Sequence, residues 1–152
     1  MNQQTDRAVL VVSFGTSYES SRKATIEKIE QDITDAFKDR RIYRAWTSKF
    51  IISLLMKRDK LHIPTVKEAM EQMIADGELL EYAQYVDNYY GTPKAYVEKQ
   101  LADGKDVILE IEIQGALKVK KQFPQTLLLF VTPPSAEILK ERLIGRGTED
   151  ME

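Results

Sequence analysis

Apolar runs alternate along the chain with stretches in which apolar residues recur every three or four positions. The run from Ala8 to Phe14 is unbroken and rich in β-branched residues, which is typical of a strand buried on both faces. Helical spacing from Ser17 to Phe37 predicts one helix with a single apolar face. A second short run, from Arg41 to Trp46, predicts another strand.

Helix start and stop signals mark the next two elements. Thr47 or Ser48 can cap the first of them, and apolar residues at helical spacing follow. Thr65 and Glu68 have the spacing of a capping box. They predict a helix that starts there, runs to Asp76 and stops at a glycine.

Short extended segments are expected over 78–90, around the turn-prone pair Asp87-Asn88. Thr92 is expected to cap the next helix and Pro93 to open it, because proline suits the first helical position. That helix should end at the next glycine along the chain.

Two further apolar runs, 107–113 and 126–132, predict strands. A helix over roughly 116–122 separates them. Ser135 can cap a last helix, which runs through Leu143.

The order of these elements indicates an α/β fold. We expect three layers, with a mostly parallel sheet of about four strands, helices on both faces and a short β excursion near 78–90. No repeat, low-complexity tract or Gly/Ser/Pro-rich linker interrupts the chain, so residues 1–152 are expected to form a single domain.

Composition narrows the class of protein. The chain has 152 residues and a formal net charge of −2, which argues against a nucleic-acid partner or an anionic membrane surface. No apolar run is long enough to span a bilayer, and the polar start lacks a secretion-type apolar segment, so a cytoplasmic protein is expected. Without cysteine there is no disulfide and no thiolate, and we expect neither a metal site nor a cofactor.

Several ordered motifs lie in the second half of the chain. They read Gly77-Glu-Leu-Leu-Glu-Tyr82, Asn88-Tyr-Tyr-Gly-Thr-Pro93, Val107-Ile-Leu-Glu-Ile-Glu-Ile-Gln-Gly115 and Arg142-Leu-Ile-Gly-Arg-Gly-Thr148. Over about 73–150 the chain resembles the middle of a guanylate kinase, from the GMP-binding region to the start of the lid. Such enzymes move a phosphoryl group from ATP to GMP, so the resemblance implies GMP as a partner.

The resemblance also implies roles for individual residues. Glu81 would accept hydrogen bonds from guanine N1 and the exocyclic amine, a charge-assisted pairing. Thr92 would lie near guanine O6, and Tyr90 would donate to the GMP phosphate. Gly91 would allow close approach of the backbone, and Glu110 would lie beside the nucleotide.

Arg142 and Arg146 are four residues apart, so both project from one helix face. The resemblance implies that they serve the ATP side, on the donor phosphates and by the adenine. The glycine-rich phosphate loop of the family is expected after the first strand, where this chain has Ser13 to Lys23 without the motif. Phosphoryl transfer depends on positioning and charge stabilisation, so we predict no kinase activity and assign no catalytic residue.

The best motifs of the first part are Ser13-Phe-Gly-Thr-Ser17 and Tyr43-Arg-Ala-Trp-Thr-Ser48. Over about 1–70 the chain resembles the N-terminal part of the anaerobic cobalt chelatase that acts on sirohydrochlorin. That family inserts cobalt with histidines of later segments. The single histidine here, His62, matches none of them, so chelatase activity is not expected.

The first strand is expected to lead into a helix N-terminus, where free amides and the helix dipole favour anions. Ser13, Gly15, Thr16 and Ser17 are candidates for such an anion loop. A plain strand–helix turn with capping serines is the alternative interpretation.

The change from one resemblance to the other falls within the helix predicted over 65–76. Our main interpretation is a recombined or engineered chimera of a chelatase-like segment, 1–70, and a kinase-like segment, 73–152, with no intact active site and at most weak GMP binding. The alternatives are a guanylate kinase fragment completed in trans by another chain, and a tetrapyrrole-binding remnant. Apolar surface that has lost its parental partner predicts a homodimer.

Overall fold

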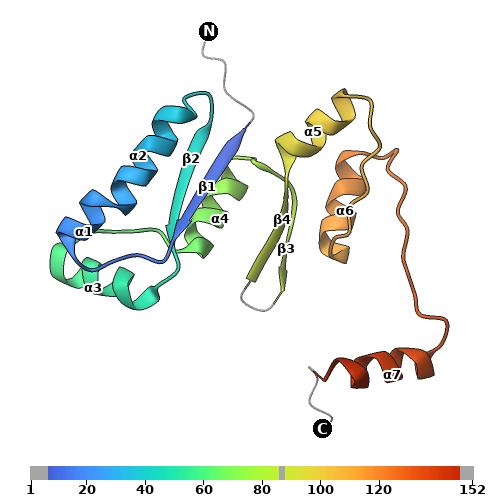
Figure 1. The fold of residues 1–152 in the computed structure, drawn as a ribbon. Helices are drawn as coiled ribbons and strands as arrows, with labels where there is room; N and C mark the ends of the chain where they lie inside the picture. The colour runs from blue at the N-terminus through green and yellow to red at the C-terminus, as the bar shows by residue number, and fades with distance from the viewer. Residues whose placement is uncertain (1–6, 86–87, 148–152) are drawn as a thin grey trace.

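The computed structural model, which describes residues 7–85 and 88–147, pairs the first two strands in parallel (Figure 1). β1 (Ala8–Ser13) and β2 (Arg41–Trp46) match residue for residue along their whole length. Both strands were predicted from their apolar runs, and both are confirmed. The expectation that the first is buried on both faces is wrong, because no residue of β1 is fully buried and Val12 is 49% exposed.

Two helices connect these strands, where the helical spacing predicted one. α1 (Glu19–Ala24) and α2 (Ile26–Ala36) are separated at Thr25, whose φ of −123° and ψ of −79° are not helical. The Thr25 hydroxyl donates to Ser21 O at 2.7 Å, a local bond that competes with the helix ladder. Arg22, which is buried, spans the break and lies 2.7 Å from Glu27 Oε1.

Two capped helices follow β2, as predicted. In α3 (Lys49–Asp59) the Ser48 side chain accepts from Ile51 N. In α4 (Val66–Ala75) the capping box of Thr65 and Glu68 is present in both directions. The first core consists of fully buried apolar side chains from β2, α3 and the loop before α4: Trp46, Leu55 and Ile63.

The β excursion is an antiparallel hairpin of β3 (Leu79–Tyr85) and β4 (Asn88–Pro93). The turn expected at Asp87-Asn88 lies partly outside the described residues. α5 (Lys94–Ala102) starts one residue after Pro93, so Thr92 belongs to β4 and does not cap the helix. Proline 93 itself is the N-cap residue.

The second core lies between the hairpin and two helices, α5 and α6 (Ile113–Gln122). Its buried members are Leu80, Val97 and Val119. α6 starts three residues earlier than the helix expected over 116–122. α7 (Ala136–Arg146), which Ser135 caps through Ile138 N, stands apart from the other helices in Figure 1.

The α/β class is confirmed, but the sheet differs from the one expected. The described residues form two separate two-stranded sheets, β1–β2 and β3–β4, in place of one mostly parallel sheet of about four strands. Residues 107–112 and 126–132, predicted as strands, run extended without a strand partner in the described part of the chain. α4 packs both on β2 and on the hairpin, so it lies between the two sheets, whereas α6 packs on β3.

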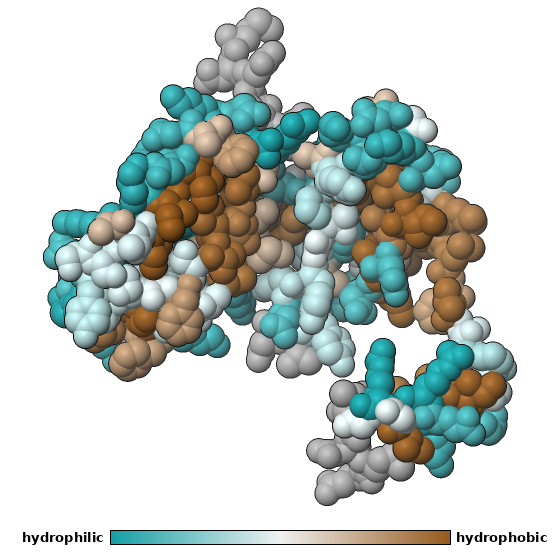
Figure 2. Space-filling model, in the orientation of Figure 1, coloured by the Kyte–Doolittle hydropathy of each residue, from teal (hydrophilic) through white to brown (hydrophobic). Residues whose placement is uncertain are grey.

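Apolar side chains consequently remain at the surface. Figure 2 shows them over the β1–β2 pair and over α6 with the extended chain that follows it. Ile108 is 95% exposed and Val131 is 91% exposed, although both are β-branched residues of the predicted strands.

Gly15 is the residue whose replacement should destabilise the first core most sharply. Its φ is +103°, and a Cβ there would lie 2.4 Å from Trp46 Cε3, a side chain that is fully buried. Gly15→Ala is therefore expected to lower the free energy of unfolding by about 2–4 kcal/mol in urea denaturation, from backbone strain and overpacking together.

The matched control is Gly104→Ala, because Gly104 also has a positive φ, +76°, and has no atom within 4 Å of the added Cβ. That variant should lose only the backbone contribution, about 1–2 kcal/mol. Equal losses in the two variants would contradict the packing of Trp46 against Gly15.

Candidate functional site

Glu81 is the buried acidic residue of the hairpin, with 4% of its surface exposed. The register of β3 against β4 shifts between Leu79 and Glu81, so Leu80 is an extra residue in β3. Such a bulge re-aims side chains. Leu80 and Glu81, although adjacent, therefore both reach α6, where Leu80 packs on Val119 and Glu81 lies against Gly115.

The Glu81 carboxylate is held from two sides. Thr92 Oγ1 donates to Glu81 Oε1 at 2.6 Å, across the hairpin. On the other side, a Cβ at Gly115 would lie 2.0 Å from Glu81 Oε2, so only glycine lets the first turn of α6 approach the carboxylate this closely. The N-terminal end of a helix favours a nearby negative charge.

Two polar side chains of α6 hold the helix onto β3. Lys118 Nζ donates to Tyr82 O at 2.7 Å and lies 3.2 Å from the centre of the Tyr82 ring. Gln122 Nε2 donates to Leu80 O, the bulge carbonyl, at 3.1 Å. The ion pairs among the described residues do not include Glu81, which contacts the Thr92 hydroxyl and the first turn of α6.

The other residues predicted for GMP are less closely grouped. Tyr90 lies two residues before Thr92 on β4 and is half exposed. Gly91 lets the strands approach, because a Cβ there would lie 2.8 Å from Leu79 Cδ1 and 3.1 Å from Glu81 O. Glu110 is exposed on the unpaired stretch 107–112. The structure thus brings Glu81 and Thr92 into contact, with Gly91 beside them.

Arg142 and Arg146 are exposed residues of α7. Figure 1 shows α7 at the end of a long extended stretch, away from the hairpin and α6. The two arginines are therefore not gathered with Glu81 in this structure.

Three groups of the predicted anion loop accept hydrogen bonds within the chain. Thr47 N donates to Ser13 O, Arg58 Nη2 donates to Ser17 O at 2.7 Å, and Thr16 Oγ1 accepts from Tyr18 N. Gly15 makes room for Trp46. The helix that follows has six residues and begins with Glu19, so it presents a carboxylate where an anion would bind.

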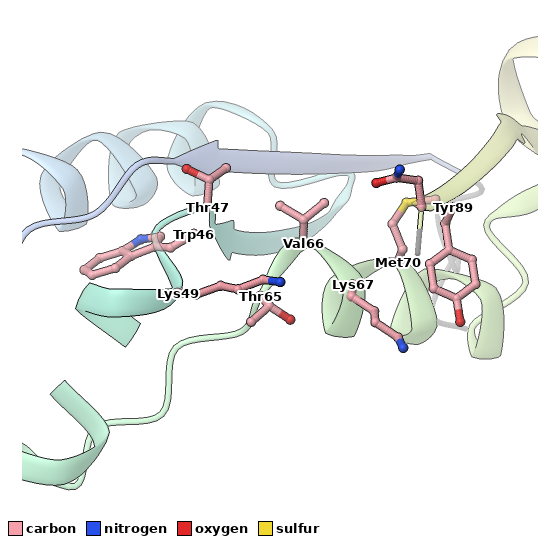
Figure 3. Close-up of a pocket in the computed structure, with 9 residues that line it drawn as sticks. Trp46, Thr47, Lys49, Thr65, Val66, Lys67, Met70 and Tyr89 are labelled. Carbon is pink, nitrogen blue, oxygen red and sulfur yellow. The ribbon is translucent and has the colours of Figure 1, made fainter. Parts of the chain in front are cut away.

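A cavity of about 620 Å³ lies on the other side of the hairpin (Figure 3). In Figure 3 the Lys49 side chain reaches from the start of α3 toward Thr65 at the start of α4. The cavity is lined by Trp46, Thr47, Lys49, Thr65, Val66, Lys67, Met70, Asn88 and Tyr89. No sequence motif pointed to it, because its residues come from three separate stretches that only the fold brings together.

Acidic and histidine side chains of the described residues form no group of three or more that is suited to hold a metal ion. His62 is exposed, with Nε2 at 3.9 Å from Glu68 Oε1. No helix in the described part of the chain has both the length and the apolar character needed to cross a membrane.

Two protein families match different parts of the chain. Residues 61–152 match the family model of guanylate kinase, and residues 7–83 match that of cobalt chelatase (CbiK). The matches overlap over residues 61–83, which contain α4. Both resemblances found in the sequence are confirmed.

Individual guanylate kinases are also similar in sequence to part of the chain. That of Oceanobacillus iheyensis is 60% identical over 86 residues, 57% of this chain and 42% of that protein. Those of Listeria monocytogenes serotype 4b and Bacillus subtilis are 58% identical over 86 residues and 60% identical over 83. These two matches cover 42% and 41% of the proteins concerned. The chain thus spans about two-fifths of the length of the curated relatives it matches.

The cavity in Figure 3 draws residues from both matched parts. Trp46, Thr47 and Lys49 belong to the chelatase match alone, and Asn88 and Tyr89 to the kinase match alone. The cavity therefore exists only where the two segments meet.

Replacing Thr92 tests the contact that holds the site together. Thr92→Val keeps the shape of the side chain and removes the hydroxyl that donates to the buried Glu81. We expect a loss of about 1–3 kcal/mol in the free energy of unfolding, measured in urea, because the carboxylate loses its donor. Thr47→Val, at an exposed position, is the control and should change little. Equal stability of the Thr92 variant and the parent would contradict the contact.

Proposed function

Because the chain belongs to the guanylate kinase family over residues 61–152 and to the cobalt chelatase family over residues 7–83, we propose that it is a recombined protein that binds guanine nucleotide weakly and performs neither parental reaction. It contains a guanylate-kinase-type fragment. The join within α4, the single domain and the GMP site are parts of this proposal.

Guanine recognition rests on one observation, the buried carboxylate of Glu81 at the hairpin bulge. A guanine edge offers two adjacent donors, N1–H and the exocyclic amine, and an ionised carboxylate accepts both. Thr92, whose hydroxyl already donates to Oε1, would either share that oxygen or turn toward guanine O6. Tyr90, which is half exposed and lies two residues before Thr92 on β4, would donate its hydroxyl hydrogen to the phosphate.

Binding should be weak because few groups converge on the nucleotide. Glu81 is largely enclosed between the hairpin and α6, so the base reaches it only if Gly115 and the first turn of α6 move away. A ligand that must first open such a contact loses part of its affinity to that opening. The exposed Glu110 and the distant Arg142 and Arg146 would add little.

Catalysis is not part of this proposal. The segment from Ser13 to Lys23, which follows the first apolar run, lacks the glycine-rich motif of a phosphate loop. Phosphoryl transfer needs a phosphate cradle, a metal and arginines in one place. Cobalt insertion likewise has no histidine cluster in the described residues.

A second candidate function is a guanylate kinase fragment completed in trans by another chain. The observation in its favour is that residues 107–112 and 126–132 lie extended and unpaired, as segments that could accept strands from elsewhere. A third interpretation, a tetrapyrrole-binding remnant, rests on the Ser13–Ser17 loop alone.

Titration with GMP, followed by amide shifts, tests the guanine site. We expect shifts confined to β3, β4 and the first turn of α6, with a millimolar dissociation constant. Glu81→Gln should weaken binding by at least about tenfold, because a charge-assisted pair is lost and an amide N–H opposes the guanine amine. AMP is the control ligand, since adenine has no N1–H, and it should leave these amides unmoved.

The absence of shifts up to millimolar GMP would contradict guanine binding. Turnover of ATP and GMP by the purified chain with Mg²⁺ would contradict the assignment of no catalysis. Turnover only after a second protein is added would favour completion in trans over the main proposal.

A further inference from the structure

Residues 126–132 form an extended segment, Thr-Leu-Leu-Leu-Phe-Val-Thr, that is apolar at every position between its two threonines. Leu129 is 79% exposed, Phe130 77% and Val131 91%. The segment starts at a fixed point, because Thr126 N donates to Phe123 O and Lys120 Nζ donates to Thr126 O at 2.7 Å. From there to Thr132 no strand of the described chain pairs with it.

An extended, exposed and apolar segment is stabilised when it pairs with another strand. Leucine, phenylalanine and valine side chains lose favourable burial when they stay in water, about 1.5–3 kcal/mol for each large side chain. Unpaired N–H and C=O groups along an exposed edge act as a template for another strand. The stretch contains neither charge nor proline nor glycine, so none of the usual devices blocks pairing.

We propose that a second copy of this chain covers the segment, by antiparallel pairing of residues 126–132 with themselves about a twofold axis at Leu129. In that register Thr126 faces Thr132 of the second copy, Leu127 faces Val131, and Leu128 faces Phe130. Threonine pairs and aromatic–aliphatic pairs are favourable across strands. The sequence is thus close to a palindrome, and a twofold axis always pairs a strand with itself in antiparallel fashion.

Charge explains why a second copy fits this segment and not the other unpaired one. Residues 107–112 carry Glu110 and Glu112, so pairing of that stretch with itself would set carboxylates of two copies close together. One of its faces is also already used, because Val107, Leu109 and Ile111 pack on the second core. Segment 126–132 carries no charged side chain, so its self-pairing brings no like charges together. Its residues 127–131 are all exposed, so neither face is buried on a core.

Disulfide cross-linking tests the pairing, since the chain has no cysteine of its own. Opposed residues of antiparallel strands have Cβ atoms about 4.5–5.5 Å apart, close to what a disulfide needs. Leu129→Cys sits on the proposed axis and should form disulfide-linked dimers under mild oxidation, at least about tenfold faster than an unpaired site. Phe50→Cys is the matched control, because Phe50 is also 77% exposed but lies on α3.

The register is tested by mixing two further variants. Leu127→Cys and Val131→Cys should cross-link quickly when mixed and slowly alone, because residue 127 faces residue 131 of the other copy. Fast linking of each variant alone with slow linking of the mixture would overturn the antiparallel register.

Analytical ultracentrifugation tests dimer formation without relying on disulfide cross-linking. The parent should sediment as a dimer whose population rises with concentration, and Leu129→Lys should be monomeric, since it places two like charges on the axis. Phe50→Lys should stay dimeric. A parent that stays monomeric, or a Leu129→Lys dimer, would overturn the proposal. The proposal would also be overturned if Leu129→Cys formed disulfide-linked dimers no faster than Phe50→Cys. A second copy would then not cover the segment.

Discussion

Backbone hydrogen bonding between strands is the constraint on which this structure depends. A buried strand is stable only where neighbours take up its N–H and C=O groups. The chain meets this requirement twice, in the parallel β1–β2 pair and in the β3–β4 hairpin. Each pair carries its own small core, around Trp46 and around Leu80. The apolar stretches 107–112 and 126–132 meet it nowhere in the described chain, and their own apolar side chains, such as Ile108 and Val131, stay exposed as a result.

The same pairing shapes the candidate site. The bulge at Leu80 turns Glu81 toward α6, and Thr92 on the opposite strand supplies its hydrogen bond. Gly115 lets the helix approach, so the carboxylate is buried without a cation. The Glu81 carboxylate is thus a structural contact between the hairpin and α6, which is why we propose weak binding at most.

The sequence predicted local structure better than assembly. The caps at Ser48, Thr65 and Ser135 depend on neighbouring residues only, and all three are confirmed. Thr92 looked like a cap, but its hydroxyl is bound by Glu81, a long-range partner that spacing cannot show. The apolar run at 126–132 has the composition of a buried strand, yet composition does not say whether another strand is within reach. The cavity at Trp46 was missed because its lining is distributed over distant stretches.

Hydrogen exchange, measured residue by residue at several protein concentrations, tests the central claim that the chain folds as two small sheets with two unpaired strands. Amides paired within β1–β2 and β3–β4 should exchange slowly at every concentration. Amides of residues 108–111 should exchange rapidly, and those of 127–131 should do so in dilute protein. Slow, concentration-independent exchange in both of these stretches would contradict the account, because it would show one continuous sheet within a single chain.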